Sequence, residues 1–177
     1  MLNSCLGQTY VARVFRREIS MCLALYIGAP KALPTVPWDP LKPAFHVIKL
    51  PKKGADVRRL LRCEHIYYVG SHEGCSCAFN YEHEFKSVLE LRDYLRGALS
   101  IADEIEGFAC RPGSEKLPVK HSIITSPDGI ALPEFFFQDS QRIVIRSKKS
   151  LRARRRAIPE RATPKRRRAR VAAPRSK

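Results

Sequence analysis

EFKSVLELRDYLRGALSIADEIE, residues Glu84–Glu106, is the stretch of this chain that decides the expected fold class. Its apolar residues recur at steps of three and four, which places them on one face of a helix. The stripe consists of Val88, Leu91, Leu95, Ala98, Ala102 and Ile105. Charged residues fall mostly off this stripe, and Gly107 is a natural helix stop. The pattern predicts one long amphipathic helix over about residues 84–106.

Short runs of apolar, aromatic and β-branched residues on both sides of this helix predict strands. The predicted strands are Met21–Gly28, Phe45–Leu50, His65–Ser71, Cys75–Tyr81, Phe108–Arg111, Val119–Thr125, Glu134–Gln138 and Arg142–Arg146. The last two bracket Asp139-Ser140 as a hairpin, Ser126–Gly129 suits a type I turn, and Ala55–Arg62 suits a short helix. This order predicts an α+β domain, a mainly antiparallel sheet with the long helix packed on one face.

Charge is distributed very unevenly along the chain. Its 177 residues include 33 Lys/Arg and 17 Asp/Glu, for a formal net charge of +16. Residues 146–177 hold 15 of the Lys/Arg and one acid, Glu160, for a net of +14, whereas the other 145 residues have a net of +2. A hydrophobic content of 44% excludes a wholly disordered chain. The chain is therefore expected to be a nearly neutral domain with a basic tail.

The basic tail, residues 147–177, has no aromatic residue and contains Pro159, Pro164 and Pro174. Such a segment buries too little apolar surface to offset its ordering entropy, so we expect it to be disordered. The predicted organisation is an N-terminal extension of uncertain status (1–20), a globular domain (21–146) and this tail.

The tail predicts association with nucleic acid or another polyanion, because a flexible polycation releases condensed counterions when it binds. The candidate nucleic-acid-binding residues are Arg152, Arg154, Arg155, Arg156, Lys165, Arg166, Arg167, Arg168 and Arg170. Without interleaved aromatic residues, we expect no base-specific readout. The candidate binding residues form two clusters, 152–156 and 165–170, which also satisfy a bipartite nuclear-import pattern. Such patterns arise readily in Arg-rich tails. An acidic membrane surface is the competing target, although no amphipathic helix accompanies the charge.

The N-terminus and the cysteines bear on the compartment. Arg13, Arg16 and Arg17 precede the apolar run 21–29, so a signal peptide, a mitochondrial transit peptide and a simple extension all compete, and we favour the extension. No run of about 18 apolar residues predicts a transmembrane helix. Six cysteines are too few for a disulfide scaffold, which favours free thiols in a reducing, cytoplasmic setting.

The segment His72-Glu73-Gly74-Cys75-Ser76-Cys77 is the best candidate for a metal site. On a strand, Cys75 and Cys77 would project from one face, and with His72 they could bind Zn²⁺. Cys63 or His65 could complete four ligands. The ordinary alternative, which we favour, is that both cysteines fill a tight place in the sheet as small apolar residues.

Thiol catalysis is a further alternative at the same segment. His72, oriented by Glu73, could activate a cysteine. If the chain began at Met21, Cys22 would become an N-terminal nucleophile like that of class II amidotransferase-like hydrolases, although Leu23 stands where they usually have Gly. The simpler alternative, which we favour, is that Cys22 is one more buried residue of its strand. No complete triad or cofactor motif is present in the sequence, so no enzymatic activity and no cofactor other than Zn²⁺ is assigned.

Three stretches, MCLALYIG (21–28), PWD (37–39) and YYVGSHEGCSCAF (67–79), resemble a small family of uncharacterised bacterial proteins. Members of that family open at the Met-Cys dipeptide and carry a Gly-Ser-His-x-Gly-Cys-x-Cys-x-Phe segment. The resemblance covers about residues 21–146 and departs from the pattern at Ser76 and Ala78, where glycines are expected. Because the family has no assigned activity, the resemblance implies a domain boundary and no mechanism.

Overall fold

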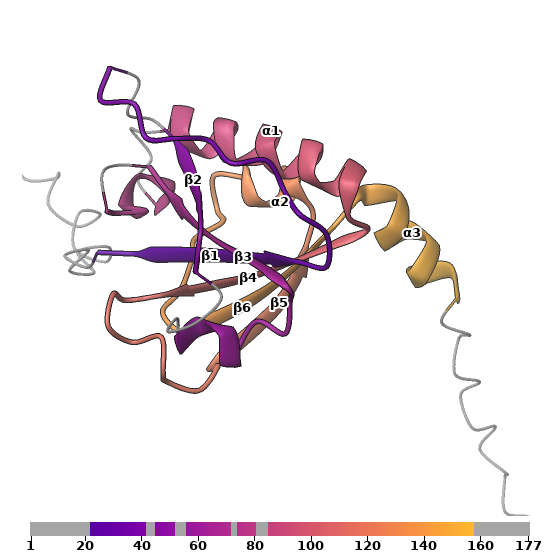
Figure 1. The fold of residues 1–177 in the computed structure, drawn as a ribbon. Coiled ribbons are helices and arrows are strands. Elements are labelled where there is room, and N and C mark those ends of the chain that lie inside the picture. The colour runs from indigo at the N-terminus through magenta and orange to yellow at the C-terminus, as the bar shows by residue number, and fades with distance from the viewer. Residues whose placement is uncertain (1–21, 42–44, 52–55, 72–73, 81–84, 158–177) are drawn as a thin grey trace, which may run out of the picture.

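The computed structural model describes residues 22–41, 45–51, 56–71, 74–80 and 85–157 (Figure 1). Its strands are β1 (Ala24–Ala29), β2 (His46–Lys49), β3 (His65–Gly70), β4 (Glu104–Cys110), β5 (His121–Thr125) and β6 (Gln141–Arg146). Its helices are α1 (Phe85–Ile101), α2 (Pro127–Ile130) and α3 (Lys148–Ala157), with 3-10 turns η1 (Asp56–Arg59) and η2 (Cys77–Asn80). Among the described residues, no helix combines the length and apolarity needed to cross a bilayer.

The strands form one mixed sheet in the order β2-β3-β1-β4-β6-β5. Every neighbouring pair is antiparallel except β5 and β6, which run parallel. The connection between these two strands passes through α2, since parallel neighbours need a crossover rather than a tight turn. The predicted α+β class, with a mainly antiparallel sheet and one long helix, is confirmed.

Helix α1 covers one face of the sheet (Figure 1). Its predicted stripe is the buried side: Leu91 and Leu95 are almost fully buried against inward-facing strand residues such as Ile27 and Ile143. The opposite face carries a smaller apolar cluster under η1, around Leu61. Burying both faces explains why β1 and the second half of β4, residues 107–110, are apolar.

The predicted helix is five residues too long, because Glu104–Glu106 belong to β4. The apolar spacing continues past Ile101, but Ile105 lies in the sheet opposite Ile145 of β6. Strand β4 also pairs with β1 on its other edge, so its backbone donors and acceptors are used on both sides. Strand pairing on both edges therefore determines the structure of residues 104–106, although their apolar spacing also suits a helix.

Two of the predicted strands are wrong. Residues 77–80 form the 3-10 turn η2, and Gly74 before it has a positive φ of 68°. Residues 134–138 are not in the sheet, because the backbone of Phe137 bonds to the side chain of Asn80. The edge of β6 that this segment would occupy is taken by β5 in parallel, so the predicted hairpin is also wrong.

The first part of the predicted disordered tail is helical. Residues Lys148–Ala157 form α3, where Lys, Arg, Leu and Ala favour a helix and no proline occurs before Pro159. The Ser147 hydroxyl accepts a hydrogen bond from the Ser150 amide at 3.2 Å, which satisfies an unpaired donor of the first turn. Residues 158–177 lie outside the described part of the chain.

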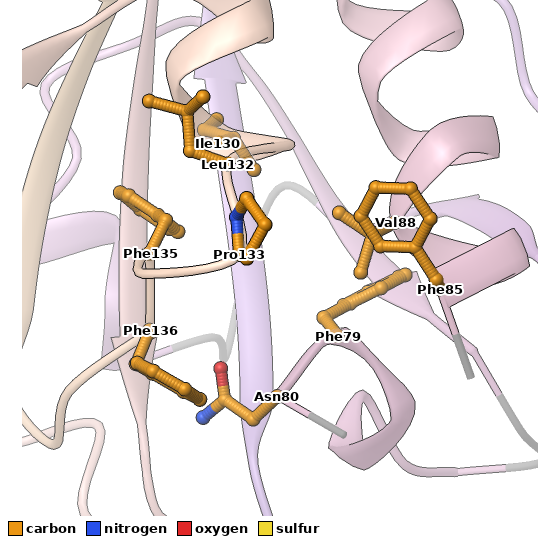
Figure 2. Close-up of a pocket in the computed structure, with 9 residues that line it drawn as sticks. All are labelled: Phe79, Asn80, Phe85, Val88, Ile130, Leu132, Pro133, Phe135 and Phe136. Carbon is orange, nitrogen blue, oxygen red and sulfur yellow. The ribbon is translucent and has the colours of Figure 1, made fainter. Parts of the chain in front are cut away.

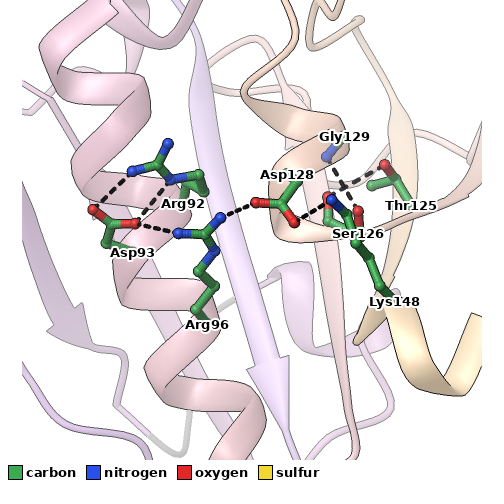
Figure 3. Close-up of polar contacts among 8 residues, drawn as sticks. All are labelled: Arg92, Asp93, Arg96, Thr125, Ser126, Asp128, Gly129 and Lys148. Atoms are coloured by element: carbon green, nitrogen blue, oxygen red, sulfur yellow. Dashed lines mark hydrogen bonds and ion pairs between the residues drawn. The ribbon is translucent and has the colours of Figure 1, made fainter.

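A polar network links the three helices (Figure 3). Asp128 of α2 forms ion pairs with Arg96 of α1 and, at 2.9 Å, with Lys148 of α3. The hydrogen bond from Lys148, together with Arg96, lowers the pKa of Asp128. The predicted turn at Ser126–Gly129 is the start of α2, where the Ser126 hydroxyl accepts from the Gly129 amide.

Candidate metal and thiol site

Three cysteines meet at one end of the sheet. Cys22 precedes β1, whereas Cys75 and Cys77 follow β3 and are joined by a disulfide. The three Sγ atoms all lie within 4.8 Å of one another. Cys22 is exposed and the other two are partly buried. The cluster therefore has one sulfur open to solvent and two that the protein partly covers.

The sheet register brings these distant cysteines together. Because β1 and β3 are antiparallel with Leu25 opposite Val69, the start of β1 lies beside the end of β3. Ser76, fully buried between the two cysteines, locks this arrangement. Its amide donates to the Leu23 carbonyl at 2.9 Å, its hydroxyl accepts from the Leu25 amide at 3.0 Å, and that hydroxyl donates to the Val69 carbonyl at 2.6 Å.

A second buried serine shapes the turn that carries Cys75 and Cys77. The Ser71 amide donates to the Cys75 carbonyl at 2.9 Å, and the Ser71 hydroxyl accepts from the Ala78 amide at 3.0 Å. Gly74 provides the left-handed conformation that this turn requires. Side-chain hydrogen bonds thus replace strand pairing, which is why this segment curls beneath Cys22 instead of continuing the sheet.

Backbone amides point at two of the sulfurs. The Leu23 N–H donates to Sγ of Cys77 at 3.4 Å, and the Cys77 N–H donates to Sγ of Cys75 at 3.1 Å. Hydrogen bonds to a sulfur favour its charged form. Burial instead raises the pKa of the Cys63 thiol to about 11 and that of Cys110 to about 12, which makes those thiols unreactive.

Aromatic residues lie behind the cluster. The Tyr68 hydroxyl is 3.5 Å from the Ser76 hydroxyl, and burial, with a smaller contribution from the nearby Cys22, raises the Tyr68 pKa. The His46 ring lies 5.7 Å from that of Tyr68 and 5.2 Å from that of Trp38. His46 is only 2% exposed, and burial lowers its pKa. Its Nδ1 has no hydrogen-bond partner among the described residues.

The structure brings together only part of the predicted metal site. Cys75 and Cys77 are adjacent, but in a turn, and they form a disulfide, so the expectation of free thiols is wrong for this pair. His72 lies outside the described residues. Neither Cys63 nor His65 joins the cluster. A Cβ built on Gly28 would lie 3.1 Å from the Cys63 sulfur, which places Cys63 over the C-terminal end of β1, whereas Cys22 precedes its start.

The candidate nucleic-acid-binding residues are only partly described. Arg152 is exposed on α3, and the helix backbone continues through Arg154, Arg155 and Arg156. The second cluster lies outside the described residues: Lys165, Arg166, Arg167, Arg168 and Arg170.

Sequence reasoning considered Cys22 as an N-terminal nucleophile or, preferably, as a buried strand residue. The second expectation is wrong, because Cys22 is exposed, and its place beside Cys75 and Cys77 was missed. The available signal was the prediction of strands at 21–28 and 65–71, each with cysteine beside it. Linking them required knowing that these two strands are antiparallel neighbours.

No protein-family model matches this chain, and no curated protein or solved structure matches it either. Its function is therefore argued from the geometry of its own residues.

Away from the cysteines, the structure has an open apolar pocket of about 470 Å³ between η2, the start of α1 and the segment after α2 (Figure 2). Its walls are mainly apolar and include the aromatic rings of Phe79, Phe85 and Phe136. Asn80 is the polar lining residue, and its amide already bonds to the Phe137 backbone. Among the residues that the structure describes, the pocket therefore presents a mainly apolar surface whose polar residue already has a partner.

Proposed function

We propose that Cys22, Cys75 and Cys77 bind a thiophilic metal ion, Zn²⁺, when the protein is reduced. The observation that carries this proposal is the convergence of three Sγ atoms within 4.8 Å. Thiolates bound to tetrahedral zinc lie about 3.8 Å apart, given zinc–sulfur bonds of about 2.3 Å. The three sulfurs therefore need only small side-chain movements to reach a common ion.

The local hydrogen bonds support a thiolate site. The amides that point at Cys75 and Cys77 stabilise negative charge on sulfur, which metal binding requires. Three thiolates leave one tetrahedral position for water or a further side chain. Cu(I), which also prefers thiolates, is the competing ion.

The alternative explanation, small apolar cysteines filling space, accounts less well for this cluster. Cys110 is fully buried and fits that description. Cys22 is exposed, and Cys75 and Cys77 are only partly buried. Space filling does not explain why an exposed cysteine lies within reach of two others more than fifty residues away in sequence.

Elemental analysis of the full chain tests this proposal. Protein prepared without chelator, reduced under anaerobic conditions and equilibrated with Zn²⁺ is expected to retain stoichiometric zinc after desalting. Cys22→Ser and Cys77→Ser each remove one of three thiolates and should lose most of the bound metal. The matched control is Cys63→Ser, a cysteine outside the cluster, which should retain it. Zinc-free wild-type protein, or undiminished zinc in both cluster variants, would contradict the proposal.

The distribution of charge favours a second function, association of the basic tail with nucleic acid or another polyanion. Residues 146–177 hold 15 of the 33 Lys/Arg. The first part of this segment includes α3, which projects from the edge of the domain (Figure 1). Lys149 and Arg152 are exposed on that helix. Such a segment gives binding that weakens steeply with salt and has little sequence preference.

A further inference from the structure

We propose that Cys75 and Cys77 form a redox-active disulfide that exchanges with small external thiols through Cys22. This goes beyond metal binding, because it needs only the three sulfurs and no ion. The external reactant is a low-molecular-weight thiol of the glutathione type.

The position and exposure of Cys22 indicate that it is the cysteine that reacts with the external thiol. Its sulfur is a free thiol within 4.8 Å of both sulfurs of the disulfide. It is also the exposed member of the cluster, whereas Cys75 and Cys77 are partly covered. An intramolecular thiol held this close acts at a high effective concentration, which a dissolved thiol at about millimolar concentration does not match. Internal attack by Cys22 is therefore the favoured way to open the disulfide.

The surroundings of Cys77 stabilise the sulfur that leaves. When the Cys22 thiolate attacks Sγ of Cys75, the electron pair of the broken bond passes to Sγ of Cys77. That sulfur accepts the Leu23 N–H, and Leu23 is buried at the start of β1, where its carbonyl is held by Ser76. The donor to Cys75 is instead the Cys77 N–H, which belongs to the turn that must shift when the disulfide opens. Since a stabilised thiolate leaves faster, we assign Cys77 as the leaving group.

The complete exchange balances with two external thiols. The first step forms a Cys22–Cys75 disulfide and releases the Cys77 thiolate, with no net oxidation. One external thiolate then attacks the exposed Cys22 sulfur, forming a mixed disulfide and releasing the Cys75 thiolate. A second external thiolate attacks the outer sulfur of that mixed disulfide, which restores the Cys22 thiolate. Two external thiols are oxidised to one disulfide, Cys75 and Cys77 are reduced, and the protons of the external thiols pass to the protein thiolates or to solvent.

This chemistry makes the oxidised and metal-binding states mutually exclusive. The disulfide uses two of the three proposed metal ligands, and reduction restores them. The exchange is nevertheless measured without metal, so its outcome is independent of the zinc experiment.

Reduction of the full chain by glutathione tests the proposal. The oxidised, metal-free protein is mixed with reduced glutathione, quenched with a maleimide at set times and mapped by peptide mass spectrometry. We expect the glutathione adduct on Cys22, and Cys22→Ser should slow reduction of the Cys75–Cys77 disulfide by about tenfold. Cys77→Ser, which removes the leaving group, should accumulate a Cys22–Cys75 disulfide on mild oxidation. Cys63→Ser is the matched control and should reduce at the wild-type rate.

Two results would overturn the proposal. One is a glutathione adduct that forms first on Cys75 or Cys77 with an unchanged rate in Cys22→Ser. The other is failure of Cys77→Ser to form any Cys22–Cys75 disulfide. Because Cys22 is exposed, its serine variant should keep the wild-type circular dichroism spectrum, so a changed rate reports on the thiol and not on unfolding.

Discussion

At Gly70, the last residue of β3, the absence of a Cβ leaves room for the His46 ring behind the cysteine cluster. A Cβ built there would lie 2.0 Å from Cε1 of His46, well inside the contact distance of two carbon atoms. The His46 ring is held between Trp38 and Tyr68 and is buried, so it has little room to move away. Glycine at position 70 is therefore required by the histidine that faces it across the sheet.

Gly70→Ala is predicted to lower the free energy of unfolding by about 1–3 kcal/mol, the usual cost of forcing an extra methyl group into a packed site. Gly97→Ala is the matched control, because its added Cβ would meet no atom within 4 Å on the exposed side of α1. Alanine is the better helix former, so this variant should gain about 1 kcal/mol. Urea unfolding of both variants checks the opposite signs. An unchanged stability of Gly70→Ala would mean that the His46 ring can move.

Ser76 is a second residue on which the candidate site depends. Its sequence position between two cysteines suggested a side chain facing away from them across a strand. In the structure it is fully buried and bonds to three backbone groups of β1 and β3. The sequence identifies Ser76 only as a small polar residue. Its role in holding Cys75 and Cys77 beside Cys22 depends on hydrogen bonds to backbone groups that are distant in sequence.

Asp128 joins elements that neighbour each other in space but not in sequence. It accepts from Arg96 on α1 and from Lys148 at the start of α3. Together with the Ser147 cap, this contact holds the first turn of α3 against the domain. The helix predicted as disordered tail is therefore ordered in part by a residue twenty positions earlier.

Asp128→Asn is predicted to lower the free energy of unfolding at neutral pH by about 1 kcal/mol or less, since its partners are largely exposed. The Lys148 contact lowers the folded-state pKa of Asp128. Its stabilisation is therefore complete above the unfolded-state pKa, near 3.9, and is lost as the pH falls through the lower folded-state value. The difference between wild type and variant should accordingly be smaller at pH 2 than at neutral pH. Urea titrations at both pH values measure it.

The control for this prediction is Asp103→Asn, an exposed aspartate with no ion pair among the described residues. It should leave the stability unchanged at either pH. A loss in Asp128→Asn that persists undiminished at pH 2 would show that the carboxylate charge is not its cause.

On the scale of the whole molecule, the charge is carried mainly outside the domain. Residues 158–177 alone contain eight Lys/Arg and one Glu, and they follow every described helix and strand. A chain ending at Ala157 therefore keeps all the described elements, including the Asp128–Lys148 contact. Removal of residues 158–177 therefore takes away the charge of the second part of the tail and leaves the fold intact.

The full chain is predicted to bind a labelled DNA duplex of arbitrary sequence with an affinity that falls steeply between low and physiological salt. The chain 1–157 should bind more weakly and with a shallower salt dependence, because fewer phosphates are neutralised and fewer counterions released. Fluorescence anisotropy across a salt series, repeated with RNA, measures both slopes. Equal affinities and slopes for the two chains would exclude residues 158–177 as the binding segment.

The sequence by itself determined the fold class, the long helix and the separation of a basic tail from a nearly neutral domain. These features depend on local periodicity and composition, which a single chain displays directly. It also singled out Cys75 and Cys77 from their short spacing. The end of the helix at Ile101 was not visible, because Ile105 suits a helical stripe and a central strand equally well.

Tertiary structure alone decided that Cys22 belongs with Cys75 and Cys77, and that His46 is buried against Gly70. Both depend on strand register: β1 against β3 in the first case, and β2 against β3 in the second. Register is set by the burial of a whole sheet face and by cross-strand hydrogen bonds, which involve residues far apart in sequence. The candidate site is thus a product of strand pairing, because its three sulfurs are brought together only when β1 and β3 lie side by side.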